Sequence, residues 1–81
     1  MSEEAIVRVL WADSAVAPGG WEDVGNFADW TVADVESIGR IIDEDSNRIV
    51  IASHFSGTGE VSGVVSIPRS AIRVMERLRK R

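Results

Sequence analysis

His54 is the only histidine of this 81-residue chain, and it directly follows Ser53. A histidine can take a proton from a serine nucleophile or bind a metal ion, but either role needs further side chains nearby. Neighbouring residues on a strand point to opposite faces of the sheet, so we expect Ser53 and His54 not to share a proton. The sequence therefore predicts no catalytic site, no metal site and no cofactor. A binding protein is favoured over an enzyme.

A run of oxygen-bearing side chains at alternate positions imitates the start of a calcium loop. Asp43, Asp45 and Asn47 have the required spacing, but Arg48 stands at the sixth position, where such loops need glycine. Acidic and amide side chains are also typical of tight turns. We therefore interpret residues 43–47 as a solvated hairpin turn.

A second polar segment, residues 57–63, has three glycines whose spacing approaches that of a dinucleotide-binding loop. The third glycine comes one position late, and no crossover helix is expected to follow. Ser56 and Thr58 lie close to His54 in the sequence, and their hydroxyls and neighbouring amides could hold an anion. All three residues are candidate binding residues.

Three tryptophans and two phenylalanines supply the large rings of the chain, which has no tyrosine. Trp11 stands in an apolar alternating segment, and we expect it in the core. Trp21 follows Pro-Gly-Gly and precedes two acidic residues, so it either anchors its loop or forms a binding surface. We favour the anchor, because an exposed tryptophan is unfavourable unless a partner covers it. Trp30 is a second candidate for a partner contact.

Charge is distributed unevenly along the chain, whose formal net charge is −4. Residues 1–60 hold twelve acids against three arginines, whereas residues 61–81 hold one acid against six basic residues. An acidic body would repel the polymer that the basic end attracts, so nucleic acid is a disfavoured partner. We expect the basic tail, residues 79–81, to be frayed. Arg40 and Arg69 are the candidates for facing an anionic group.

The composition predicts one small domain spanning residues 1–81, because a chain this short cannot hold two separate cores. The absence of cysteine excludes disulfides and sulfur-ligated zinc, so stability must come from apolar burial, extended by self-association. The apolar runs are too short for a membrane helix. Acidic residues stand where the basic part of a signal peptide would be, so we expect a cytoplasmic protein without membrane contact.

Most of the chain has the period-two pattern of β-strands. A long connection, residues 14–30, is interrupted by Pro18 and two glycines. Residues 31–43 allow two interpretations. Residues 31–34 could cap a short helix, but we favour a strand over 31–43 in which Gly39 marks a bend or bulge. The predicted strands are residues 5–13, 31–43, 48–54 and 61–67.

The segment after Pro68 fits two templates. Apolar residues at helical spacing in 69–78 are compatible with a C-terminal helix, which would make the fold α+β. The same residues also alternate as a strand would. We favour one helical turn at 68–70 followed by a fifth strand, which gives an all-β fold.

This order of elements resembles that of small SH3-like and Sm-like barrels. Several phrases of the sequence also resemble a scattered group of short bacterial and phage-borne proteins: residues 10–13, 20–21, 37–40, 49–52 and 67–72. The resemblance covers most of the chain and implies a five-stranded barrel that self-associates through exposed strand edges. It also implies carriage on a phage or other mobile element, and it implies no activity.

We therefore expect a non-catalytic, homo-oligomeric interaction module. Its partner contacts would involve Trp21, Trp30 and the turn at 56–59, with Arg40 or Arg69 facing an anionic group. One alternative is a protein that sequesters a small anionic, nucleotide-like ligand between protomers, with His54 and Arg69 as polar contacts. Another is a single-stranded nucleic acid binder that uses the basic end and stacked aromatic rings.

Overall fold

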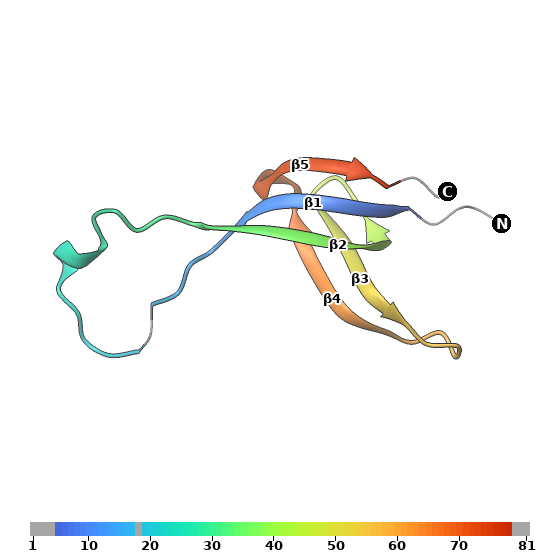
Figure 1. The fold of residues 1–81 in the computed structure, drawn as a ribbon, viewed down its shortest axis with the longest axis horizontal. Helices are drawn as coiled ribbons and strands as arrows, with labels where there is room; N and C mark the ends of the chain where they lie inside the picture. The colour runs from blue at the N-terminus through green and yellow to red at the C-terminus, as the bar shows by residue number, and fades with distance from the viewer. Residues whose placement is uncertain (1–4, 18, 79–81) are drawn as a thin grey trace.

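The structure, a computed structural model, describes residues 5–17 and 19–78 and consists of one antiparallel sheet of five strands (Figure 1). The order across the sheet is β4-β3-β2-β1-β5. The predicted basic tail, residues 79–81, lies outside the described residues. The elements are β1 (Ile6–Asp13), the 3-10 helix η1 (Val24–Phe27), β2 (Ala33–Glu44), β3 (Arg48–Phe55), β4 (Val61–Pro68), the 3-10 helix η2 (Arg69–Ala71) and β5 (Ile72–Arg77).

The mainly β fold is confirmed, but the predicted closure into a barrel is wrong. β4 and β5 form the two edges of the sheet and do not pair with each other within the described residues. After β4, η2 turns the chain so that β5 pairs with β1. The C-terminal helix considered as an alternative is also wrong, because its residues form η2 and β5. No helix in the part of the chain that the structure describes is long and apolar enough to cross a membrane.

The core lies on one face of this curved sheet. The alternating residues Val7, Val9 and Trp11 of β1 are buried, as the period-two pattern predicts. They pack with Ile49, Ile51 and Ile67, which come from β3 and β4. The indole Nε1 of Trp11 donates a hydrogen bond to Ser37 Oγ at 3.0 Å, so the one polar atom of this buried ring has a partner.

Gly39 allows β2 and β3 to approach closely. A Cβ at this position would lie 2.8 Å from the carbonyl oxygen of Ala52 and 3.3 Å from the Cβ of Ile51. The predicted bulge is therefore misplaced: the register between β2 and β3 shifts between Ile41 and Asp43, two residues further along β2. Gly39 is required for space at the backbone of the neighbouring strand.

The connection between β1 and β2 extends away from the sheet as an arm, defined here as the described residues 14–17 and 19–32 (Figure 1). The arm begins where the last pair of the β1–β2 ladder, Asp13 with Ala33, ends. The whole molecule measures 55 × 26 × 25 Å and has a radius of gyration of 16.3 Å. A compact domain of this length has a radius of gyration of about 12 Å. The chain is therefore strongly elongated, and the arm accounts for one end of it.

Candidate binding surfaces

The arm presents apolar side chains that the rest of the chain does not cover. Trp21 is fully exposed, with a relative accessible surface of 103%, and Val24 is 86% exposed. The expectation that Trp21 anchors its loop is therefore wrong. Gly20, which precedes it, has a positive φ of 127°, and no atom lies within 4 Å of where a Cβ would be. The full exposure of the indole shows that no described side chain covers it.

The tip of the arm nevertheless has a defined local structure. The Asp23 carboxylate accepts a hydrogen bond from the Gly25 backbone N–H at 3.0 Å and so caps η1. The rings of Phe27 and Trp30 meet edge to face, with centroids 5.1 Å apart. Trp30 therefore packs on the arm itself, and half of its surface stays exposed. The arm is acidic, with Glu22, Asp23 and Asp29 and no lysine or arginine.

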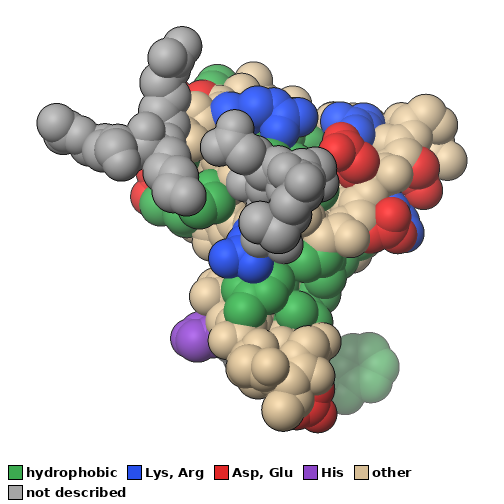
Figure 2. Space-filling model, turned by 90° about the vertical axis from the view of Figure 1, so that its right-hand side faces the viewer, with side chains coloured by type: hydrophobic (Ala, Val, Ile, Leu, Met, Phe, Trp, Pro, Cys, Tyr) green, Lys and Arg blue, Asp and Glu red, His purple; other side chains and the backbone are tan. Residues whose placement is uncertain are grey.

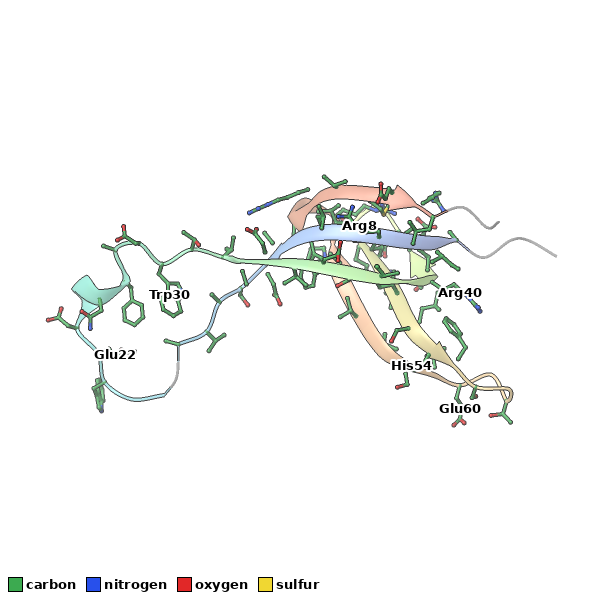
Figure 3. The ribbon with its side chains drawn as sticks, viewed as in Figure 1. Arg8, Glu22, Trp30, Arg40, His54 and Glu60 are labelled. Atoms are coloured by element: carbon green, nitrogen blue, oxygen red, sulfur yellow. The ribbon has the colours of Figure 1, made fainter. Side chains whose placement is uncertain are left out.

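A second surface lies at the opposite end of the sheet from the arm, where Figure 3 labels Arg40. The Arg40 guanidinium carbon lies 3.9 Å from the centre of the Phe55 ring, a cation–π contact. Beside it is a shallow hollow of about 230 Å³, called here the Arg40 hollow. Figure 2 shows hydrophobic side chains gathered at this end of the molecule, near the single histidine. The hollow is lined by Ile6, Ile38, Gly39, Arg40, Ala52, Ser53 and Phe55.

Three apolar residues of this hollow, Ile6, Ile38 and Phe55, are missing from the predicted binding residues. All three are partly exposed, Ile38 by 53%. A signal for the first two was present in the sequence, because apolar residues occupy both faces of the alternating segments that become β1 and β2. Ile6 and Arg40 are direct neighbours across these strands, as are Arg8 and Ile38. The outer face of the sheet thus combines apolar and basic side chains with Glu36 and Glu76, whose carboxylates pair with Arg8.

His54 and Ser53 meet, contrary to the expectation from strand geometry. Ser53 Oγ lies 2.8 Å from His54 Nδ1, and either atom can be the donor, depending on the tautomer of the ring. Gly63 on β4 leaves room for this contact, because a Cβ at Gly63 would collide with Ser53 Oγ. Among the described residues no carboxylate forms a hydrogen bond with His54, so the arrangement lacks the third member of a catalytic triad.

The candidate anion-binding turn after β3 is closed by its own hydrogen bonds. Ser56 Oγ accepts from the backbone N–H groups of Thr58 (3.3 Å) and Glu60 (3.0 Å). Thr58 Oγ1 donates to the Glu60 carboxylate at 3.3 Å and contacts Ser56 Oγ at 3.1 Å. Glu60 also lines an open recess of about 430 Å³ beside His54 and Phe55. A carboxylate at this position repels an anion, so the turn is a poor phosphate site.

Arg69 is separated from the other candidates and ties the start of η2 to the β2–β3 turn. Its Nε donates to the Asp45 carbonyl at 2.6 Å, and its Nη2 contacts the Glu44 carboxylate at 3.0 Å. Its backbone N–H donates to the Asn47 carbonyl at 2.9 Å. These contacts give Arg69 a structural role between two turns.

The β2–β3 turn is held by Arg48 and two aspartates. Arg48 Nη2 lies 2.7 Å from Asp43 Oδ2, and this hydrogen bond lowers the pKa of the Asp43 carboxyl group, with help from the positive charge. Asp45 Oδ1 accepts the backbone N–H groups of Asn47 and Arg48 at 2.7 and 2.9 Å, which lowers the pKa of Asp45. Both side chains are thus used inside the turn, as its interpretation as a hairpin predicts. The described acidic and histidine side chains form no group of three or more that would hold a metal ion.

The candidate residues therefore fall into separate groups. Trp21 and Trp30 lie on the arm, whereas Arg40 and His54 lie at the far end of the sheet, with Ser56 and Thr58 in the turn that follows (Figure 3). Arg69 belongs to neither group. No family model, curated protein or solved structure matches this chain. A function therefore has to be inferred from these surfaces.

Proposed function

We propose that this chain is a non-catalytic interaction module that associates with further copies of itself, and that the arm supplies its main contact surface. The observation that carries the proposal is the exposure of large apolar side chains on the arm. Trp21, Val16 and Val24 are almost fully exposed, and Trp30 and Val32 are half exposed. Large exposed apolar side chains, tryptophan above all, are typical of surfaces that a partner covers.

The total surface of the chain supports self-association. Its accessible surface is 6475 Å². A compact monomer of the same mass exposes about 4,800 Å². The excess, about 1,700 Å², is more than the roughly 800 Å² that each partner buries in a standard interface. The buried core is also small, with six side chains in its central cluster. Burial between copies would supply apolar contacts that the isolated chain lacks.

The oligomeric state tests this proposal. Light scattering from low to high micromolar concentration should give a mass of at least twice 8.8 kDa at the upper end. A mass that stays at 8.8 kDa over the whole range contradicts the proposal. The variant Trp21→Ser should shift the distribution toward the monomer, whereas Ser46→Ala, an exposed change in the β2–β3 turn, should leave it unchanged.

The two alternative functions give different results in solution. A protein that sequesters an anionic ligand should gain thermal stability with nucleotides or other anionic metabolites. A single-stranded nucleic acid binder should bind oligonucleotides with an affinity that falls as salt is raised. The acidic arm and the Glu60 carboxylate beside His54 disfavour both ligands. The resemblance to SH3-like and Sm-like proteins, carriage on a mobile element and a cytoplasmic location stay predictions.

A further inference from the structure

The arm and the Arg40 hollow have complementary chemistry. The arm offers an exposed indole, Trp21, followed directly by two carboxylates, Glu22 and Asp23. The Arg40 hollow offers apolar walls from Ile6 and Ile38 and a guanidinium at its edge. An indole excluded from water by apolar walls, with charged pairs around it, is the usual composition of a strong interface contact.

The hollow is large enough for one aromatic side chain and is open to solvent. Its volume is about 230 Å³, and Phe55, 39% exposed, forms part of its lining. The Arg40 guanidinium already lies over the Phe55 ring at 3.9 Å, so the positive charge is held next to the apolar wall. The incoming carboxylates of Glu22 and Asp23 would therefore meet a fixed cation at the edge of the hollow.

The arm lies far from the hollow of its own chain in this structure. The arm leaves the sheet after the pair Asp13–Ala33, whereas the hollow lies at the pair Ile6–Arg40, at the other end of the same two strands. Seven residue steps along a strand span roughly 23 Å. Figure 3 shows Glu22 and Trp30 on the arm, which points away from the end of the sheet that carries Arg40. With the arm in this conformation, a contact between the two surfaces requires a second molecule.

We propose that the Trp21–Glu22–Asp23 segment of the arm inserts into the Arg40 hollow of a second copy of this chain. The proposal rests on the self-association proposed above and names its contact. Trp21 fills the space between Ile6, Ile38 and Phe55 of the second copy. Both halves of the contact are present in every copy, so no other partner is needed.

Charge reversal tests the contact. Arg40→Glu should weaken self-association at least tenfold, and so should Glu22→Lys combined with Asp23→Lys, because each leaves like charges facing one another. Chains that carry all three changes should associate to within about threefold of the wild type, since opposite charges face each other again. Circular dichroism checks that each variant keeps the sheet. If Arg40 contacts only groups of its own chain, the variant with all three changes should associate no better than Arg40→Glu alone. That result would contradict the proposed contact.

Cysteine cross-linking gives a second test, which reports the proximity of two residues in the complex and does not measure an affinity. The chain has no cysteine, so single introduced thiols report one contact each. A Glu22→Cys chain mixed with a size-tagged Ile38→Cys chain should form a mixed disulfide under mild oxidation. A size-tagged Ser46→Cys chain is the control, because Ser46 lies in the exposed β2–β3 turn outside the hollow. The Ile38→Cys chain should cross-link at least tenfold faster than this control.

The outcomes separate the two proposals. A wild-type chain that stays monomeric contradicts the proposed function and this contact together. A wild-type chain that associates, but shows neither charge rescue nor preferential cross-linking to Ile38→Cys, overturns the contact alone. Self-association would then have to use another surface, such as the free edges of β4 and β5.

Discussion

At the scale of single residues, two glycines decide how the sheet packs. Gly39 lets β2 approach the Ala52 carbonyl, and Gly63 leaves room for the Ser53 hydroxyl. The sequence indicated that Gly39 was special, but it could not distinguish a bulge from a close approach, because that depends on the atoms of the neighbouring strand. No signal in the sequence indicated the contact between Ser53 and His54, for which a glycine on the neighbouring strand leaves room.

Gly39→Ala should destabilise the protein by about 1–3 kcal/mol, because the new methyl group would press on backbone atoms that cannot move without disrupting the strand pairing. Urea unfolding at neutral pH measures the change in the free energy of unfolding. Gly57→Ala is the matched control, because a Cβ at Gly57 meets nothing within 4 Å. We expect it to change stability by less than about 0.5 kcal/mol. Equal midpoints for the two variants would contradict this role of Gly39.

At the scale of elements, the strands and the long connection between the first two were predictable, but the extension of that connection away from the sheet was not. Alternation along residues 5–13 and 48–54 predicted β1 and β3 to within one residue, because their inward positions are apolar. Alternation also led to the correct choice of a fifth strand after Pro68. The position of Trp21 was inferred wrongly, because the sequence does not show how far a loop extends from the body. Ile6, Ile38 and Phe55 were missed because exposed apolar residues look like core residues in a sequence.

The β2–β3 turn should make stability depend on pH in the acid range. Folding lowers the pKa of Asp43 and Asp45. These carboxylates therefore stabilise the folded state at pH values above their ordinary pKa, which is about 4. Their contribution is lost as the pH falls through the lowered folded-state values, where both groups are protonated. Arg48, whose pKa is raised, stays charged throughout this range.

Asp43→Asn should therefore lower stability at pH 7 and have a progressively smaller effect toward pH 3. Urea unfolding at several pH values gives the difference in the free energy of unfolding between variant and wild type. Ser46→Ala, in the same turn, keeps both carboxylates and should retain the wild-type dependence on pH. A difference for Asp43→Asn that is constant with pH would show that the carboxylate charge does not contribute.

At the scale of the whole molecule, the fold leaves much surface uncovered. The sheet is open, its edges are β4 and β5, and the arm extends the long axis to 55 Å. Composition predicted one small domain that needs more burial than a single copy provides. It could not predict whether the sheet closes, because closure depends on how strand curvature brings β4 and β5 together.

Small-angle X-ray scattering of the diluted, monomeric chain should give a radius of gyration near 16.3 Å. A compact chain of this length would give about 12 Å. The larger value is expected because the arm stands off the sheet with no body contacts for Trp21. A monomer value close to that of a compact chain would mean that the arm folds back, and it would remove the exposed surface on which the proposed function depends.

The placement of the arm and the Arg40 hollow at opposite ends of β1 and β2 gives each molecule a head and a tail. Two copies that lie side by side in opposite directions could each fill the other's hollow, which produces a closed pair with no vacant contact. Copies that all lie in the same direction would instead leave one arm vacant at one end of the array and one hollow vacant at the other. Such an array adds further copies until its curvature closes it into a ring or no unbound chains remain.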